Sequence, residues 1–465
     1  MTVRATVTGA VRASLPRSFL GLSMEYWDLP AFASHPDAMA RVLGLLHVPG
    51  DGLLLLRVGG DSADQAYWGR RAGRGLGPWP YHVTRRWLHT LAGIVRSADV
   101  HVMLDLNLAA GSPGMAARFA RAALRSLPRG SLWGFEIGNE PDIYHHWVDY
   151  HLPGRASLFA SSGEWDQFSP RRYVAAFAAY ARALSRVAPG LPLAGPATAH
   201  PLRDLAWERR LLADAAGHVA MITVHRYPLT ACAHRRATDF STVARVLSTR
   251  ISAGLQPVVT PALELARQAG LPVRMTELNS VTCEGRRGVS NTLASALWAP
   301  DALFSLWRAG LAGANIHVRQ GAANAAFSMA RHGLDARPLL YGLALFARAA
   351  GRRGELARLR VGRWSSAVRL WAVRSGRRLN VLVLDKGPHP AHLALRVPSG
   401  RPAVIQRLLG PSVQATAGVT LAGQRLAPDG RWVGRRTVAH ARLGPGRRYR
   451  VRVPAYSGAL ISFRL

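Results

Sequence analysis

Residues 132–141 read LWGFEIGNEP and residues 271–279 read LPVRMTELN, two short and mostly apolar runs that each lead to a lone glutamate. Runs this short, bounded by turn residues, are typical of buried strands. A carboxylate at the carboxyl end of such a strand lies at the mouth of a parallel barrel, where the loops that carry chemistry meet. We therefore expect Glu140 and Glu277 to lie at one barrel mouth.

Eight runs of this kind are spaced along the chain, and segments with helical periodicity separate them. The runs are residues 19–24, 53–58, 100–106, 132–137, 191–195, 220–224, 271–275 and 314–318. Strand and helix alternating eight times predict an α/β fold of the (β/α)₈ TIM-barrel type. An open doubly wound sheet would usually carry a glycine fingerprint after its first strand, and this sequence has none.

The pattern changes near residue 350. Beyond it, apolar residues alternate with polar ones, and Gly and Pro punctuate the segments, which predicts an antiparallel β-sandwich. The opening residues 3–11 alternate in the same way. We expect residues 1–14 to add a strand to the sandwich, residues 15–349 to form the barrel, and residues 350–465 to form the sandwich domain.

The charge is strongly basic, with a formal net charge of +34 and a single lysine, Lys386, among 60 basic residues. Arginine is scattered along the chain and is not gathered on one helix, so a nucleic-acid partner is not favoured. Residues 351–465 hold 23 basic residues and three acidic ones, hence +20 of the total. That surface could attract an acidic polysaccharide by its long-range field, or it could be a solvated basic face without a partner.

Location and redox state follow from other features. No run approaches 18 uncharged apolar residues, so we expect no membrane span. The N-terminus lacks the apolar core of a secretion signal, which fits a cytoplasmic protein or, as we expect, a secreted one whose leader is absent from this chain. Cys232 and Cys283 follow the ends of neighbouring predicted strands. They could form one disulfide or stay as two thiols.

The paired glutamates predict glycoside hydrolysis with retention, which needs two carboxyl groups about 5 to 5.5 Å apart. We expect Glu140 to be the acid/base, because Asn139 beside it can hydrogen-bond a sugar 2-hydroxyl. Glu277 is then the nucleophile. Arg57 after the second strand and Tyr227 after the sixth can supply the cation and the hydroxyl that lower its pKa.

Two histidines also end strands, His225 and His317. A third metal ligand near them in the sequence is missing, and strand-end histidines commonly hydrogen-bond catalytic carboxylates. We therefore expect His225, with Arg57, to orient the nucleophile, and we expect neither a metal nor another cofactor.

Several segments resemble one known family. They are FLGLSMEY (19–26), LRVGGDSAD (56–64), FEIGNEPD (135–142), HRYPL (225–229), TELNSVTCEGRRGVSNTLASALW (276–298) and VPAYSGALISF (453–463). Together they resemble glycoside hydrolase family 79, the β-glucuronidase and heparanase family, over nearly the whole chain. The resemblance implies a retaining barrel enzyme with a C-terminal β-domain that acts on β-linked glucuronic acid. It also implies that Glu140 is the acid/base, that Glu277 is the nucleophile, and that Glu25 and Asp61 hold ring hydroxyls.

The sequence departs from that family where the glucuronate carboxylate would bind. The family uses backbone amides in a Gly-rich loop after the nucleophile strand, aided by a tyrosine hydroxyl. Here Glu284 precedes Gly285, where we expect two glycines, and residues 321–329 offer Phe327 but no tyrosine. The amide of Gly285 and the guanidinium of Arg319 are then the expected carboxylate ligands.

Other functions stay open at this point. One is a retaining β-glycosidase of another barrel-plus-sandwich family that acts on a neutral β-xyloside or β-glucoside. Another is a noncatalytic polyanion-binding protein that uses the basic C-terminal domain. The sequence also leaves open whether cleavage is exo or endo and whether the chain oligomerises. It predicts a loop over the mouth at residues 151–168.

Overall fold

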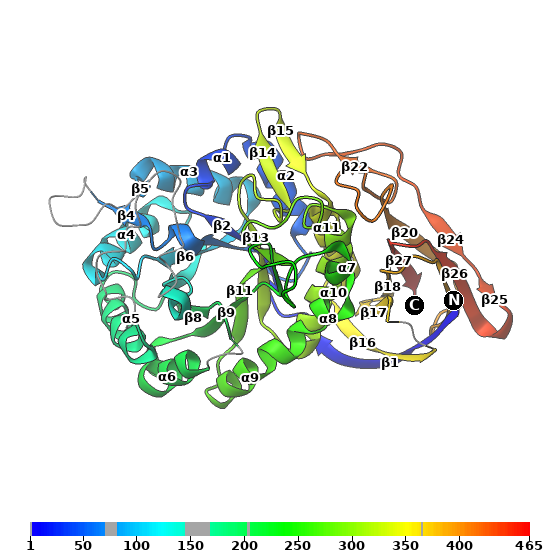
Figure 1. Cartoon of the computed structure of the whole chain (residues 1–465), viewed down its shortest axis with the longest axis horizontal. Coiled ribbons are helices and arrows are strands. Elements are labelled where there is room, and N and C mark those ends of the chain that lie inside the picture. The colour runs from blue at the N-terminus through cyan, green and yellow to red at the C-terminus, as the bar shows by residue number, and fades with distance from the viewer. Residues whose placement is uncertain (1, 70–80, 145–167, 202–204, 364–365) are drawn as a thin grey trace.

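The computed structural model describes residues 2–69, 81–144, 168–201, 205–363 and 366–465. The loop expected at residues 151–168 therefore lies outside the described residues, apart from Phe168 at its end. A barrel ringed by helices forms one part of the molecule, and a curved sheet that holds both chain termini forms the other (Figure 1). Within the described ranges, no helix is long and apolar enough to cross a membrane.

Eight parallel strands close the barrel, as the alternating pattern predicts. Around the barrel they follow one another in chain order, and the last pairs with the first. They are β2 (Leu20–Glu25), β3 (Leu55–Gly59), β6 (His101–Leu106), β7 (Leu132–Ile137), β8 (Leu193–Thr198), β9 (Met221–Arg226), β11 (Val273–Leu278) and β13 (Gly313–Val318). Every residue of β2 and β11 is buried, because helices cover the outer face and side chains fill the interior.

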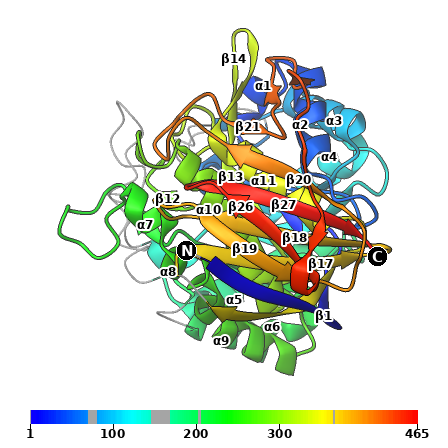
Figure 2. The ribbon, with the colours of Figure 1, turned by 90° about the vertical axis from the view of Figure 1, so that its right-hand side faces the viewer.

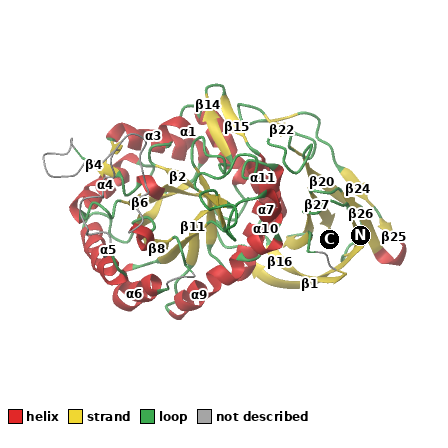
Figure 3. Ribbon diagram, viewed as in Figure 1, coloured by secondary structure: helices red, strands yellow, loops and turns green. Residues whose placement is uncertain are grey.

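Helices surround the strands on the outside (Figure 3). Their starts are set locally: Thr84, Ser112 and Ser169 each accept a backbone N–H from the first turn of the helix that follows. The helices are α1 (Leu29–Phe32), α2 (Pro36–Leu46), α3 (Arg85–Ala98), α4 (Pro113–Ser126), α5 (Pro170–Ser185), α6 (Ala206–Ala215), α7 (Val243–Leu247), α8 (Thr249–Ser252), α9 (Leu255–Gln268), α10 (Leu293–Ala309) and α11 (Pro338–Ala350).

Short two-stranded sheets form within the loops between these elements. They are β4 (Ala66–Trp68) with β5 (Tyr81–Val83), β10 (Leu229–Thr230) with β12 (Val281–Thr282), β14 (Phe327–Ala330) with β15 (Gly333–Ala336), and β22 (Arg425–Leu426) with β23 (Trp432–Val433). The β10–β12 pair matters most for the site, because it joins the loop after β9 to the loop after β11.

The C-terminal region forms one large curved sheet. Along the sheet the order is β21 (Thr420–Leu421), β20 (Ala403–Leu409), β27 (Ser457–Arg464), β18 (Arg378–Asp385), β17 (Val368–Ser375), β16 (Glu355–Arg363), β1 (Thr2–Ser14), β19 (Ala391–Arg396), β26 (Arg448–Val453) and β25 (Leu443–Gly444). A further strand, β24 (Ala439–Ala441), pairs with β20. The sheet curls so that side chains of β1, β19 and β26 meet those of β18, β20 and β27 in a core of their own.

The N-terminal strand β1 is an exception to a purely antiparallel sheet. It pairs antiparallel with β16 but parallel with β19, with Val3 opposite Leu393. In Figure 2 it lies beside β19, with β26 on the far side of β19, on the face of the molecule turned to the viewer.

The sheet also packs against the barrel, and strand alternation explains how. In β18, Val381 and Val383 belong to the core between the layers of the sheet, whereas Leu382 and Leu384 belong to the large core shared with the barrel. Successive side chains on a strand point to opposite faces, so one strand serves both cores. On the barrel side the partners are α10 and α11, which are almost entirely buried.

Candidate active site

Glu140 and Glu277 lie together at the carboxyl ends of the barrel strands. Glu277 is the penultimate residue of β11, and Glu140 comes three residues after β7 in a turn where its own φ is +47°. One carboxylate oxygen of each lies within 4.8 Å of the other, and a ring nitrogen of His225 lies within the same distance of both. The two carboxyl groups are therefore close enough to act on the two atoms of a single bond.

Arg57, on β3, is fully buried beneath them and binds several carboxylates. It donates from Nη1 to Glu277 at 2.8 Å, from Nε to Glu136 at 2.7 Å and from Nη2 to Asp105 at 2.9 Å. Burial alone would lower the pKa of Arg57, but the charges of Glu136, Asp105 and Glu277 raise it. The guanidinium therefore stays charged at the floor of the site.

Glu277 is held in its ionised form. Burial would raise its pKa, but the charges of His317, His225 and Arg57 and a hydrogen bond from His317 keep that pKa well below its usual value. Tyr227 also donates its hydroxyl to Glu277 Oε1 at 2.5 Å. A carboxylate that is ionised and held by fixed donors is suited to attack an electrophilic carbon.

His317, at the end of β13, supplies a positive charge. Its Nδ1 is 2.9 Å from Glu277 and 2.6 Å from the Tyr227 hydroxyl. Burial would lower the pKa of His317, but Glu277 and Glu25 raise it to about 10. The sequence marks His317 only as a strand-end histidine, and its place between Glu277 and Glu25 depends on strands distant in the chain.

Glu140 has the opposite character. Burial raises its pKa, His225 lowers it, and repulsion from Glu277 and Asp142 raises it again, so that the net shift is upward. His225 Nδ1 lies 3.0 Å from Glu140 Oε1. The pair of glutamates thus combines a carboxyl group that holds its proton more tightly than usual with one that loses it more readily, as acid/base chemistry at one centre requires.

A chain of hydrogen bonds fixes the tautomer of His225. The Thr276 hydroxyl donates to Glu136 at 2.8 Å, so it accepts from His225 Nε2, which lies 3.2 Å away. His225 Nδ1 then accepts a hydrogen bond from protonated Glu140 when the ring is neutral, and donates one to ionised Glu140 when the ring is charged. Sequence reasoning placed His225 beside the nucleophile, whereas its direct contact is with Glu140. It missed Glu136 and Thr276, which look like ordinary strand residues.

Asn139 and Asp61 form the wall next to Glu140. The Asn139 side-chain oxygen accepts from Arg57 at 3.0 Å, and its amide nitrogen lies 3.4 Å from Asp61. Burial and repulsion from Glu25, Glu140 and Glu277 raise the pKa of Asp61 well above its usual value. Both side chains present polar atoms that can hydrogen-bond sugar hydroxyls.

Glu25 differs from the expectation that it holds a ring hydroxyl. Its side chain has no exposed surface, and one oxygen accepts the backbone N–H of Ser62 at 2.8 Å. The other lies 3.4 Å from His317 Nε2, an ion-pair contact without hydrogen-bond geometry. Glu25 is packed beneath Gly60. From there its negative charge raises the pKa of His317, and its contact with Nε2 helps to position the ring.

Arg319 lies at the rim and has two carboxylate neighbours. Its guanidinium is 3.7 Å from Asp61 and 3.4 Å from Glu284, and it lies 5.5 Å from the centre of the Trp27 ring. The Glu284 side chain is 58% exposed, so a competing anion can reach this ion pair. Phe327 is fully buried against Phe32 and belongs to the core.

Gly285 follows Cys283 and Glu284 in a tight turn. All three have positive φ, and a Cβ at Gly285 would lie 2.7 Å from the backbone nitrogen of Asn324, so only glycine fits. The Gly285 N–H donates to the Thr282 carbonyl at 3.1 Å. That amide, which we expected to bind a substrate carboxylate, is engaged within the turn.

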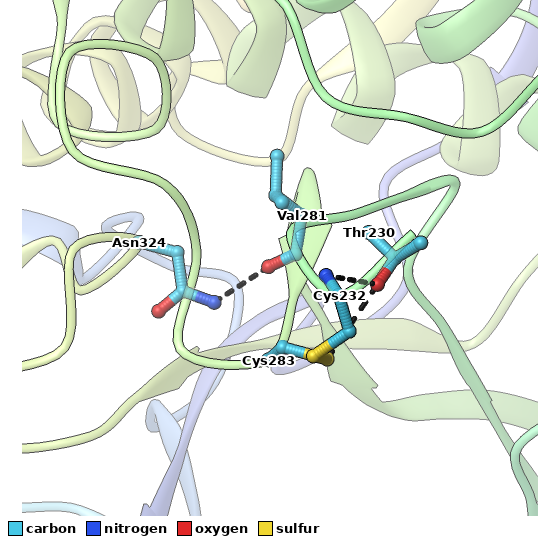
Figure 4. The surroundings of a disulfide bond; sticks show 5 residues. All are labelled: Thr230, Cys232, Val281, Cys283 and Asn324. Atoms are coloured by element: carbon cyan, nitrogen blue, oxygen red, sulfur yellow. Dashed lines mark hydrogen bonds between the residues drawn. A yellow bond between two sulfur atoms is a disulfide. The ribbon is translucent and has the colours of Figure 1, made fainter. Parts of the chain in front are cut away.

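Cys232 and Cys283 are joined by a disulfide, with their Cα atoms 6.1 Å apart (Figure 4). Thr230 accepts the N–H of Cys232, and Asn324 donates to the carbonyl of Val281 on the other side of the bridge. The disulfide thereby ties the loop after β9 to the loop that carries Glu284, next to the β10–β12 pairing.

The cluster of Glu140, His225 and Glu277 has spacing that could hold a metal ion. Its surroundings oppose one, however. Both ring nitrogens of His225 are engaged by Glu140 and Thr276, and cationic Arg57 and His317 contact the Glu277 carboxylate. Arg57 and His317 already supply positive charge beside Glu277, and they would repel a metal cation bound there.

No known protein family and no curated protein matches this chain by sequence. Several solved structures share its fold. A 4-O-α-L-rhamnosyl-β-D-glucuronidase from Fusarium oxysporum 12S has 17% identity and a TM-score of 0.76, covering 98% of this chain and 100% of the other. The GH51 arabinofuranosidase from Xanthomonas axonopodis pv. citri has 15% identity and a TM-score of 0.72, covering 99% of both chains. The family 30 subfamily 8 xylanase Xyn30A from Clostridium acetobutylicum has 13% identity and a TM-score of 0.59, covering 99% and 100%. At these identities the likeness establishes a shared barrel-plus-sandwich fold.

Proposed function

We propose that this chain is a retaining glycoside hydrolase in which Glu277 is the nucleophile and Glu140 the acid/base. The observation that carries the proposal is the pairing of two carboxyl groups within 4.8 Å whose pKa values are shifted in opposite directions. That separation suits direct attack by one carboxylate and leaves no room for the intervening water of an inverting enzyme. Shared fold with several glycosidases supports it.

The reaction proceeds in two displacements. Glu140 gives its proton to the glycosidic oxygen while Glu277 attacks the anomeric carbon, so the aglycone leaves as an alcohol and a glycosyl ester forms on Glu277. Glu140, now ionised, takes a proton from water, which attacks the same carbon and releases Glu277. The charges on Arg57 and His317 favour Glu277 as the leaving carboxylate in this second step.

We propose β-linked glucuronic acid, or a related uronic acid, as the sugar, either in glycosides or in an acidic polysaccharide. Arg319 supports this substrate, because its guanidinium lies at the rim, next to Asp61, and is partly exposed. A substrate carboxylate would replace Glu284 as the partner of Arg319. The fold neighbour from Fusarium oxysporum is itself described as a glucuronidase.

A neutral sugar is the second candidate, and one observation favours it. Glu284 already neutralises Arg319, and the Gly285 amide is engaged with Thr282. A β-xyloside or β-glucoside would need neither group. We further propose that the protein works in an oxidising compartment, since Cys232 and Cys283 are paired.

A panel of aryl glycosides tests the reaction and the sugar together. The wild type should cleave the aryl β-glucuronide faster than the β-xyloside and β-glucoside, and NMR of the first product should show a retained β configuration. Glu277→Gln should abolish turnover while the far-UV circular dichroism spectrum stays unchanged. Inversion, or a folded Glu277→Gln protein with wild-type rates, would refute the proposed mechanism.

Glu140→Ala gives the complementary test. Aryl substrates with good leaving groups need little acid assistance, so the glycosyl-enzyme should accumulate, and azide should accelerate its release as a β-glycosyl azide. Glu264→Gln serves as the matched control, because Glu264 is in α9 on the outside of the barrel. Equal losses on all leaving groups without azide rescue would point to another acid.

A further inference from the structure

A cavity lies between the loops that follow β10 and β12, at the end of the barrel that carries the candidate active site. Its volume is about 540 Å³. Arg235, Ser241 and Thr242 line it from the first loop, and Arg286 and Arg287 line it from the second. The first loop continues from Tyr227 and the second from Glu277, so the cavity belongs to the same end of the barrel as the reaction centre.

The charged residues that line this cavity are all positive. Three arginines line it, and none of the described lining residues is acidic. Within the described ranges, Arg235, Arg286 and Arg287 form no ion pair within 4.0 Å with a carboxylate. Three like charges around one cavity repel one another, and a bound anion would relieve that repulsion.

Arg286 is held in place rather than free in solvent. Its guanidinium lies 4.4 Å from the centre of the Phe240 ring, and its Nη1 donates to the Ser241 carbonyl at 3.2 Å. Holding a guanidinium in advance reduces the entropy lost when it binds an anion. Arg235 and Arg287 are exposed and can close on a ligand from either side.

Ser241 adds an independent observation. The residue is completely buried, yet its side-chain hydroxyl has no hydrogen-bond partner among the described residues. A buried polar group without a partner costs about 1 to 3 kcal/mol. Ser241 lines the cavity, so a ligand oxygen there would satisfy the hydroxyl once the side chain turns toward it.

The disulfide keeps the two walls of the cavity together. Cys232 lies three residues before Arg235, and Cys283 lies three residues before Arg286. Because the bridge joins both loops, the backbone that carries the arginines is tied both to β9, which ends just before Tyr227, and to β11, which carries Glu277.

We propose that this cavity is a second carbohydrate subsite, which binds a carboxylate on a sugar residue remote from the scissile bond of an acidic oligosaccharide. The proposal rests on the proposed function for the position of the scissile bond and deepens it by naming a polyanionic glycan as the substrate class. Arg286 would hold the carboxylate, Arg235 and Arg287 would enclose it, and the Ser241 hydroxyl would donate to one of its oxygens.

Binding is measured without turnover, in the Glu277→Gln background, by isothermal titration calorimetry. The probes are β-linked tetraglucuronate, the same tetrasaccharide with its carboxyl groups reduced to alcohols, and inorganic sulfate. Arg235→Gln with Arg287→Gln is the test variant. Arg450→Gln with Arg452→Gln is the matched control, since these arginines are exposed on β26 and remove the same charge.

The test variant should bind tetraglucuronate at least about fivefold more weakly, the effect of two partly exposed charge contacts, while the control variant changes less than twofold. Both should bind the reduced tetrasaccharide equally. Ser241→Ala should also weaken tetraglucuronate binding without lowering the unfolding temperature, because it removes an unpaired hydroxyl.

Three results would overturn the proposal. One is an equal loss of tetraglucuronate affinity in the test variant and the control variant, which would indicate that only the overall positive charge of the protein attracts the ligand. Another is unchanged tetraglucuronate affinity in the test variant. The third is that tetraglucuronate and sulfate compete for the site and bind with equal affinity, which would indicate a site for free anions. Calorimetry measures binding without turnover. The test of this cavity therefore gives its own answer even if the protein does not hydrolyse glycosides.

Discussion

Replacing Asp301 with asparagine should weaken the junction between the barrel and the C-terminal sheet. Asp301 lies in α10 with no exposed side-chain surface, and it accepts from Lys386 at 2.7 Å and from Arg369 at 3.0 Å. Ser252 donates to it at 2.5 Å and the Trp371 indole at 2.9 Å. Lys386 and Arg369 come from the sheet side, so this buried ion pair connects the two parts of the chain.

The expected magnitude follows from the burial and the pKa. Removing one partner of a buried ion pair costs about 3 to 5 kcal/mol in free energy of unfolding. Burial would raise the pKa of Asp301, but Lys386 and Arg369 lower it to about 2 from an ordinary value of 3.8. The shift corresponds to roughly 2 to 3 kcal/mol of stability. Because the folded-state pKa is depressed, this stability is fully present above about pH 4 and is lost as the pH falls through about 2.

Urea unfolding followed by tryptophan fluorescence measures the effect, and Trp371 provides a local reporter. The difference between wild type and Asp301→Asn should be constant from pH 7 to about 5 and should shrink by about 2 kcal/mol as the pH falls to about 2.5. Asp301→Asn with Lys386→Met should be more stable than Asp301→Asn alone, since no lone ammonium group is then buried.

A surface control separates this effect from general charge loss. Asp429 is half exposed, with its carboxylate 3.6 Å from Arg431, so Asp429→Asn should change the free energy of unfolding by less than about 1 kcal/mol. A difference for Asp301→Asn that is below about 1 kcal/mol, or that does not vary with pH, would refute the reasoning.

Other predictions concern the site. Tyr227→Phe removes the donor to Glu277 and should raise the pKa of Glu277, which moves the acid limb of the kcat/KM profile to higher pH and lowers kcat/KM about tenfold or more. An unmoved acid limb would argue against that role. Thr276→Val leaves His225 Nε2 without its acceptor and should slow substrates with poor leaving groups more than those with good ones, as a series of aryl glycosides would show. Arg319→Ala should lower kcat/KM for an aryl β-glucuronide by about tenfold and for the β-glucoside much less, and equal losses would make Arg319 structural. Thiol titration of the denatured, unreduced protein should find no free thiol, and two per chain would contradict the disulfide.

Much of the fold was predictable from local pattern. Each barrel strand is a short apolar run between turn residues, and every one of the eight expected runs overlaps a strand of the closed barrel. The parallel pairing of β1 with β19 was not predictable, because alternation shows that a segment is a strand but not which neighbour it joins.

The candidate site divides in the same way. Glu140 and Glu277 stand out in the sequence because a glutamate that ends an apolar run is chemically conspicuous. Glu136, Thr276 and His317 do not, because their roles depend on the residues that face them from other strands. Glu25 has a conspicuous position, yet the structure buries it behind His317.

The sequence by itself determined the alternation of strands and helices, the change of pattern near residue 350 and the presence of carboxylates at strand ends, because these depend on hydrophobic periodicity and on residue type. The tertiary structure alone decided which carboxyl group has the raised pKa and which has the lowered one. Proton affinity depends on burial and on charges a few ångströms away, and closure of the barrel brings Arg57 and His317 to Glu277 while it leaves Glu140 with His225.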